Sequence, residues 1–208
     1  PNSPKQLGEI LFERLGLPVN PDVAMIGMVS RLTDQKGFQL VEERMEELLQ
    51  AEVQVVLLGT GEPQFEHSFR YFESRYPDKM KSLITFDLGL AQQIYASCDF
   101  FLMPSAFEPC GLSQLMAMRY GTLPIVHETG GLRDTVQPYN QYTGEGTGYS
   151  FNRFDGWTML QTIYYALDVY YNRPGAHKQL VEQAMTRDFS WTGPTKEYLA
   201  LYHSLLQG

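Results

Sequence analysis

The sequence predicts an α/β protein built on a doubly wound parallel sheet of the Rossmann-like kind. From the start of the chain to Val126, apolar runs alternate with amphipathic segments, which is the pattern of strands joined by helical crossovers. Two runs, VQVVLL and DFFLM, are nearly continuous in apolar residues, as expected where helices cover both faces of a sheet. Glycine-containing loops follow the strands, at the edge where open parallel sheets bind their ligands.

The strands are expected at the apolar runs. They lie near residues 24–30, 53–58, 82–86, 99–103 and 123–127, with a shorter sixth near 148–152.

Helices are expected between and after these strands. They lie near residues 37–50, 63–75, 91–97, 111–120, 156–171, 176–187 and 194–206. Gly121 suits a left-handed cap at the end of the fourth helix, and Pro194 suits the first turn of the last. In the fifth helix, aromatic and leucine side chains recur every three or four residues and predict a face packed inward: Trp157, Leu160, Tyr164, Leu167 and Tyr171.

The composition is that of a globular protein: 43% of the 208 residues are hydrophobic, enough for a buried core. The net charge of −8 disfavours nonspecific binding to nucleic acid or to anionic membranes. Cys98 and Cys110 form no metal-type or secreted-type pattern, so free thiols in a cytoplasmic setting are expected. We expect residues 1–208 to form one domain cut from a longer protein, because the chain begins at Pro1 without methionine.

The loops that follow the strands should share one rim of the sheet. Arg31 and Lys36 lie five residues apart in the first loop, where both cations can converge on one diphosphate; an ordinary solvated basic loop has the same spacing. In the loop after the fourth strand, the Glu108 carboxylate can accept sugar hydroxyls, or act as a helix-dipole or salt-bridge partner instead. An anionic, hydroxyl-rich ligand suits this combination.

The fourth expected helix begins in the same loop. The backbone amides of Gly111, Leu112 and Ser113 have no partner inside a helix and suit phosphate oxygens. Cys110 precedes them, but no histidine lies near it in the sequence, so we interpret it as a packing or contact residue rather than a nucleophile.

The rim continues after the fifth strand. Gly130 and Gly131 can bring amides near a ligand, although a plain turn explains them equally well. His127 ends the strand and is expected to face the rim, while histidines in such places more often pack or cap. No Asp-X-Asp pair and no metal-type histidine spacing occurs in the sequence, so a metal-independent site is expected.

Six motifs carry a family resemblance: VSRLTDQKG, LLGTGE, PSAFEPCGLSQLMAMRYGTLPIV, TGGLRDTV, GTGYSF and FSW. With these motifs the chain resembles, nearly end to end, the carboxyl-terminal domain of bacterial glycogen synthases and plant starch synthases. The resemblance implies one half of a B-type glycosyltransferase fold with extra C-terminal helices, and a helix over residues 190–208 that packs toward the missing N-terminal domain. It also implies transfer of glucose from ADP-glucose to the nonreducing end of an α-1,4-glucan, with retention and without a metal or other cofactor.

The resemblance implies roles for individual residues. Arg31, Lys36 and Glu108 become the candidate catalytic residues, with the two cations on the pyrophosphate and the carboxylate on the glucose, while Phe86 flanks the adenine. The same implied site includes the remaining candidate contacts: Cys110, Gly111, Leu112, Ser113, His127, Gly130 and Gly131. Many relatives have arginine where this chain has His127. Because half of a cleft cannot enclose the reaction, the isolated chain is expected to be inactive.

Two other functions stay open. One is a different retaining glycosyltransferase that uses a UDP- or GDP-linked sugar, because the fold fixes the diphosphate and not the base. The other is a noncatalytic glucan-binding module. Either a covalent or a front-face route to retention is compatible with the residues.

Overall fold

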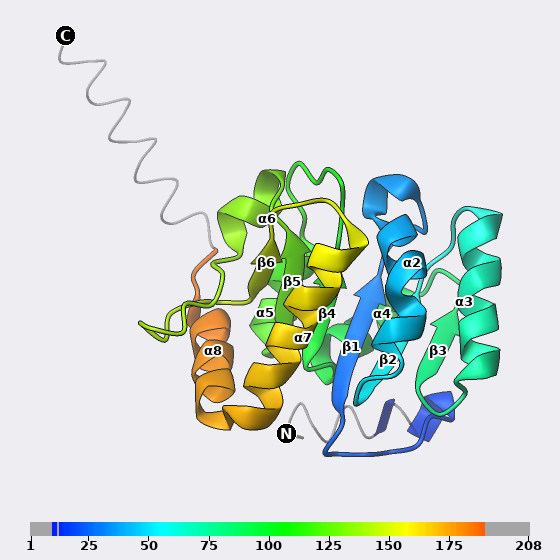
Figure 1. The fold of residues 1–208 in the computed structure, drawn as a ribbon, viewed down its shortest axis with the longest axis horizontal. Helices are drawn as coiled ribbons and strands as arrows, with labels where there is room; N and C mark the ends of the chain where they lie inside the picture. Colours follow the sequence, from blue (N-terminus) through cyan, green and yellow to red (C-terminus); the bar gives the residue numbers. More distant parts are fainter. Residues whose placement is uncertain (1–9, 12, 190–208) are drawn as a thin grey trace, which may run out of the picture.

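The computed structural model describes residues 10–11 and 13–189, and in these residues six parallel strands form one sheet (Figure 1). The strands are β1 (Ala24–Val29), β2 (Val53–Leu58), β3 (Met80–Leu83), β4 (Phe100–Met103), β5 (Leu123–His127) and β6 (Tyr149–Phe151). Their order in space is β3-β2-β1-β4-β5-β6, and every neighbouring pair is parallel. This order is that of a doubly wound Rossmann-like sheet, so the predicted fold class is confirmed.

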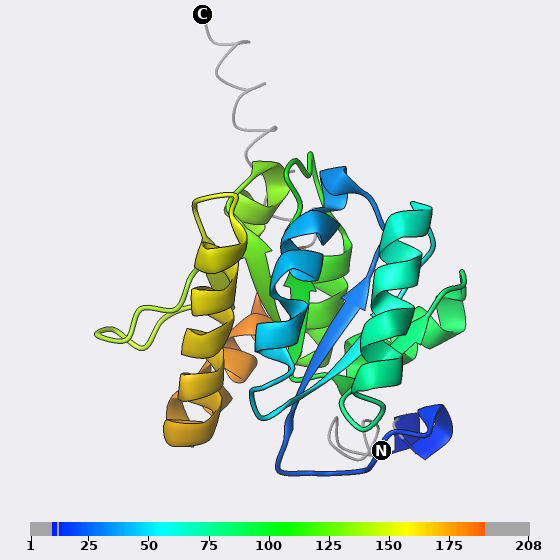
Figure 2. The same cartoon turned by 45° about the vertical axis from the view of Figure 1, so that its right-hand side comes forward.

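Helices pack on both faces of this sheet (Figures 1 and 2). They are the short 3₁₀ helix η1 (Asp34–Lys36) and the α-helices α2 (Phe38–Leu48), α3 (Pro63–Arg75), α4 (Leu88–Ser97), α5 (Ser113–Tyr120), α6 (Gly130–Thr135), α7 (Gly156–Asn172) and α8 (Pro174–Thr186). Helices α2, α3 and α7 lie on one face, and α4 and α5 lie on the other (Figure 1). Helix α8 contacts both α5 and α7.

Both faces of the strands are buried, which explains their continuous apolar runs. Side chains alternate between the faces of a strand, and in β1 Ile26 and Met28 join the core under α2 and α7 while Met25 joins the core under α4. In β4, Phe100 and Phe101 divide in the same way. The sheet is therefore the middle layer of three.

Several element boundaries differ from the sequence prediction. Strand β3 ends at Leu83, so Phe86, expected at its end, lies beyond it in an exposed loop. Helix α4 begins at Leu88, three residues early, because the Asp87 carboxylate accepts a hydrogen bond from the amide of Leu90 and caps the helix. The left-handed cap at Gly121 is confirmed, with φ of 89°.

The prediction that Trp157 packs inward is wrong, because its side chain is 58% exposed. Trp157 lies in the first turn of α7, one residue after the buried Gly156, and the inward face of the helix is formed instead by Met159, Leu160, Ile163, Ala166, Leu167 and Val169. The helix expected at residues 194–206 lies outside the described residues. Within the described ranges, no helix is long and apolar enough to cross a membrane.

Candidate functional site

Two adjoining cavities lie at the carboxyl ends of the strands, where the winding of the sheet reverses between β1 and β4. The smaller has a volume of about 80 Å³ and the larger about 270 Å³. Val29, Ser30 and Ser113 line both, so the two cavities share a wall. In doubly wound sheets the crevice at this reversal is where ligands bind.

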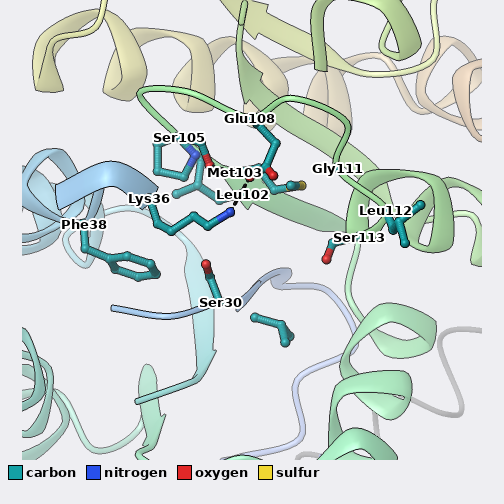
Figure 3. A pocket seen from close by; sticks show the side chains of 12 residues that line it. Ser30, Lys36, Phe38, Leu102, Met103, Ser105, Glu108, Gly111, Leu112 and Ser113 are labelled. Carbon is teal, nitrogen blue, oxygen red and sulfur yellow. Dashed lines mark hydrogen bonds and ion pairs between the residues drawn. The ribbon is translucent and has the colours of Figure 1, made fainter. Parts of the chain in front are cut away.

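An ion pair occupies the smaller cavity. The Lys36 ammonium lies 2.5 Å from Oε2 of Glu108, and the two side chains point toward each other across the cavity (Figure 3). They are only 19% and 13% exposed, so solvent screens their attraction weakly. Ser105 Oγ donates to the same carboxylate oxygen at 3.3 Å. The structure thus joins two predicted site residues that lie 72 positions apart in the sequence.

Backbone contacts hold this pair in place. Lys36 is the last residue of η1, and Gly37 follows it in the left-handed conformation, which turns the chain into α2. The amide of Ala106 donates to the carbonyl of Gln35 at 2.9 Å, and this bond joins the loop after β1 to the loop after β4.

The start of α5 forms another wall of the smaller cavity. The helix begins at Ser113 rather than Gly111, and Leu112 is its N-cap residue. The first amides of a helix have no partner within it, so this end of α5 offers hydrogen-bond donors and the positive end of the helix dipole. Gly111, Leu112 and Ser113 all line the cavity.

The larger cavity is mainly apolar and contains Arg31. Phe86 is 82% exposed at its mouth, and Leu88, Tyr95 and Met116 line it. Burial raises the pKa of the Tyr95 hydroxyl, and this hydroxyl donates to Ser113 Oγ at 3.1 Å. Arg31 and Lys36, expected to converge, line adjoining cavities rather than the same one.

The imidazole of His127 is buried below the rim instead of facing it. Its Nδ1 lies 2.8 Å from the carbonyl oxygen of Ser105, and because a carbonyl only accepts, Nδ1 carries the proton. The ring packs against Phe151 and Phe154. The structure therefore places His127 under the loop that carries Ser105 and Glu108.

Gly130 and Gly131 begin a helix, α6, at a position where the sequence predicted a tight turn, either plain or with amides near a ligand. The amide of Gly131 donates to the carbonyls of Glu108 and Pro109, at 3.0 and 3.2 Å. A Cβ atom at Gly131 would lie 2.1 Å from the carbonyl oxygen of Cys110. The pair therefore allows α6 to approach the loop that carries Glu108, and the Gly131 amide is already engaged there.

Cys110 is an exposed free thiol in the same loop. Ser30, Tyr95 and Gln114 were not among the residues predicted for this site. Ser30 and Tyr95 line the cavities, and Gln114 lies buried beneath Cys110 and Gly111. Over the described part of the chain, no three His, Cys, Asp or Glu side chains are grouped so that they could hold a metal ion.

Comparison with known proteins assigns the family. The model of the group 1 glycosyl transferases matches residues 11–157, more than half of the chain. The chain belongs to the group 1 glycosyltransferases. The glycogen synthase of Streptococcus equi subsp. zooepidemicus is 60% identical over 95% of this chain, and that of Streptococcus sanguinis is 61% identical over 94%.

A solved structure extends this match. The catalytic domain of starch synthase IV from Arabidopsis thaliana, bound to ADP and acarbose, superposes with a TM-score of 0.87 at 32% identity. The match covers 99% of this chain and 43% of that one. The resemblance seen in the sequence is confirmed, and this group 1 glycosyltransferase chain spans about 42% of the length of the curated relatives it matches.

Proposed function

We propose that this chain is the donor-binding part of a glycogen synthase, which transfers glucose from ADP-glucose to the nonreducing end of an α-1,4-glucan with retention of configuration. One observation carries the proposal: the Lys36–Glu108 pair and the start of α5 line one small cavity beside a larger apolar one. Cations and helix amides suit phosphates, a carboxylate suits sugar hydroxyls, and an apolar cavity suits a base.

Each part of the donor then has its own contacts. Lys36, Arg31 and the first amides of α5 bind the diphosphate, and Glu108 binds the glucose. The adenine enters the larger cavity against Phe86. During transfer, Lys36 and Arg31 neutralise the negative charge that grows on the departing ADP, a contribution made mainly in the transition state.

The Lys36–Glu108 ion pair affects how tightly ADP and ADP-glucose bind. With no donor bound, Lys36 is already neutralised by Glu108, so a diphosphate must compete with this carboxylate for the ammonium. Glucose hydroxyls that hydrogen-bond to Glu108 lessen this competition, because they stabilise the carboxylate in place of the ammonium. We therefore expect ADP-glucose to gain from both charges and free ADP to gain from Lys36 alone.

The rest of the enzyme supplies the other wall of the cleft and much of the glucan-binding surface in this proposal. This part of the proposal is supported by the length of the chain, which spans only 42% of the length of its glycogen synthase relatives. An enclosed site excludes water from the reaction, and one wall cannot do so. We expect the chain to bind ADP-glucose without adding measurable glucose to glycogen.

Calorimetric titration of the 208-residue chain with ADP, UDP, GDP and maltoheptaose tests two points. It shows which nucleotide base the chain prefers, and whether the chain binds nucleotides or only glucan. We expect ADP to bind about tenfold or more tightly than UDP or GDP, a difference of about 1.4 kcal/mol, because the three ligands share the diphosphate and differ in the base that enters the larger cavity. Stronger binding of UDP or GDP would favour another sugar-nucleotide transferase. Binding of maltoheptaose with no nucleotide affinity would favour a glucan-binding module.

A further inference from the structure

A buried glutamine lies directly beneath the proposed phosphate-binding turn. Gln114 is the second residue of α5 and has 0% exposure. Its Nε2 group lies within hydrogen-bond distance of three acceptors: the carbonyls of Cys110 and Gly111, at 3.2 and 3.0 Å, and the hydroxyl of Thr135 in α6, at 3.1 Å. One side-chain amide thus joins the turn before α5 to a different helix.

Thr135 continues this connection. Its hydroxyl donates to the carbonyl of Gly131 at 2.6 Å, so its hydrogen is used there and its oxygen is free to accept from Gln114. The amide of Gly131 in turn donates to the carbonyl of Glu108. The turn over residues 108–111 is therefore attached to α6 at both ends, by Gly131 at one and by Gln114 at the other.

The geometry of the peptide unit explains what these bonds do. In a trans peptide the C=O and the N–H point in opposite directions. Two carbonyls drawn inward to Gln114, those of Cys110 and Gly111, turn the amides of Gly111 and Leu112 outward. Both of these residues line the smaller cavity.

Stability alone does not account for a glutamine at this position. Its Oε1 is buried and has no hydrogen-bond partner. A buried polar atom without a partner destabilises a fold, whereas a methionine of similar size would leave no such atom. The bonds that Nε2 donates are the feature that sets Gln114 apart from an apolar residue.

We propose that Gln114 is a positioning residue for the nucleotide: through the bridge from Cys110 and Gly111 to Thr135, it holds the turn before α5 with its amides directed at the phosphates. The inference rests on the proposed function of the site. A fixed set of donors binds an anion more tightly than a mobile set, because no ordering is required on binding.

The test compares two buried glutamines. Gln54 in β2 is 4% exposed, donates from Nε2 to the carbonyls of Pro18 and Asp78, and also has an unpartnered Oε1, but it lines neither cavity of the site. Gln114→Met and Gln54→Met each remove a buried side-chain amide, the first beneath the turn before α5 and the second in β2. ADP affinity is measured by calorimetry and the thermal midpoint by circular dichroism, on the wild-type chain and on both variants.

We expect the two variants to change the thermal midpoint by similar amounts, and only Gln114→Met to bind ADP about tenfold more weakly, while Gln54→Met stays within about twofold of wild type. Equal ADP affinity in the two variants would overturn the inference and leave the proposed function intact. A wild-type chain that binds no ADP would overturn both.

A second pair of variants tests the bridge if Gln114→Met does not fold. Thr135→Val removes the hydroxyl that accepts a hydrogen bond from Gln114. Thr162→Val is the control, because the Thr162 hydroxyl in α7 donates to the carbonyl four residues earlier, as the Thr135 hydroxyl does in α6. We expect Thr135→Val to weaken ADP binding about threefold and Thr162→Val to leave it unchanged. A folded Thr135→Val chain with wild-type affinity contradicts the bridge.

Discussion

Replacing Lys36 by alanine should weaken ADP binding by roughly 10- to 100-fold. A hydrogen bond from a charged group contributes about 1.5–3 kcal/mol, which corresponds to about this range. The loss is increased by Glu108, whose carboxylate is 13% exposed and would then face the diphosphate without its cation. Isothermal calorimetry with ADP measures the change, and Arg31→Ala, which removes an exposed cation from the adjoining cavity, should have a smaller effect.

Two further variants separate the loss of the Lys36 contact from the loss of an ion pair in general and from the effect of the unpaired Glu108 carboxylate. Lys81→Ala breaks another partly buried pair, Lys81–Glu73, which lies between β3 and α3 away from both cavities, and should leave ADP affinity unchanged. Adding Glu108→Gln to Lys36→Ala should restore part of the lost affinity, because it removes the unpaired negative charge. If ADP binds Lys36→Ala and Arg31→Ala as tightly as it binds wild type, the role assigned to these cations is wrong.

Replacing Gly37 by alanine should lower the free energy of unfolding by about 3 kcal/mol or more. Two costs combine. Gly37 has φ of 79°, where an L side chain is strained by about 1–2 kcal/mol. A Cβ atom there would also lie 1.9 Å from the carbonyl oxygen of Pro104, so the loop after β4 must move. Urea denaturation of the two proteins measures the difference.

Gly16 provides the matched control. It has φ of 73°, but a Cβ atom there would meet no atom within 4 Å. Gly16→Ala should therefore show only the backbone cost of about 1–2 kcal/mol. Equal losses at the two positions would mean that the contact between Gly37 and Pro104 does not constrain the loop that carries Ser105 and Glu108.

The sheet is predictable from the sequence because its signals are local. The runs VQVVLL and DFFLM are buried on both faces, and that burial requires continuous apolar residues. Trp157 was predicted to pack inward from its three-residue spacing to Leu160, but the buried Gly156, Leu160 and Ile163 place the inward face of α7 to one side of it.

Helix α6 and the joining of the loops after β1 and β4 depend on contacts between residues far apart in the sequence, which local sequence patterns do not reveal. Gly130 and Gly131 are poor helix formers, and their helix is stabilised by its contact with the turn over residues 108–111. Pairing of Lys36 with Glu108 likewise depends on the order of strands β1 and β4 in the sheet.

The position of Gln114 could have been noticed from sequence. It precedes the apolar Ala117 and Met118 by three and four residues, so it lies on the inward face of α5. A polar side chain on an apolar helix face is a signal that it has bonding partners inside the protein. Which partners it has, in the turn and in α6, becomes visible only with the fold.

The central claim is that the crevice between β1 and β4 binds the diphosphate of a sugar nucleotide. A crystal structure of the chain with ADP-glucose tests it most directly. We predict phosphate oxygens within hydrogen-bond distance of Lys36 Nζ and of the first amides of α5, with the glucose against Glu108 and the adenine beside Phe86. A diphosphate bound away from Lys36 and from the start of α5 would contradict the claim.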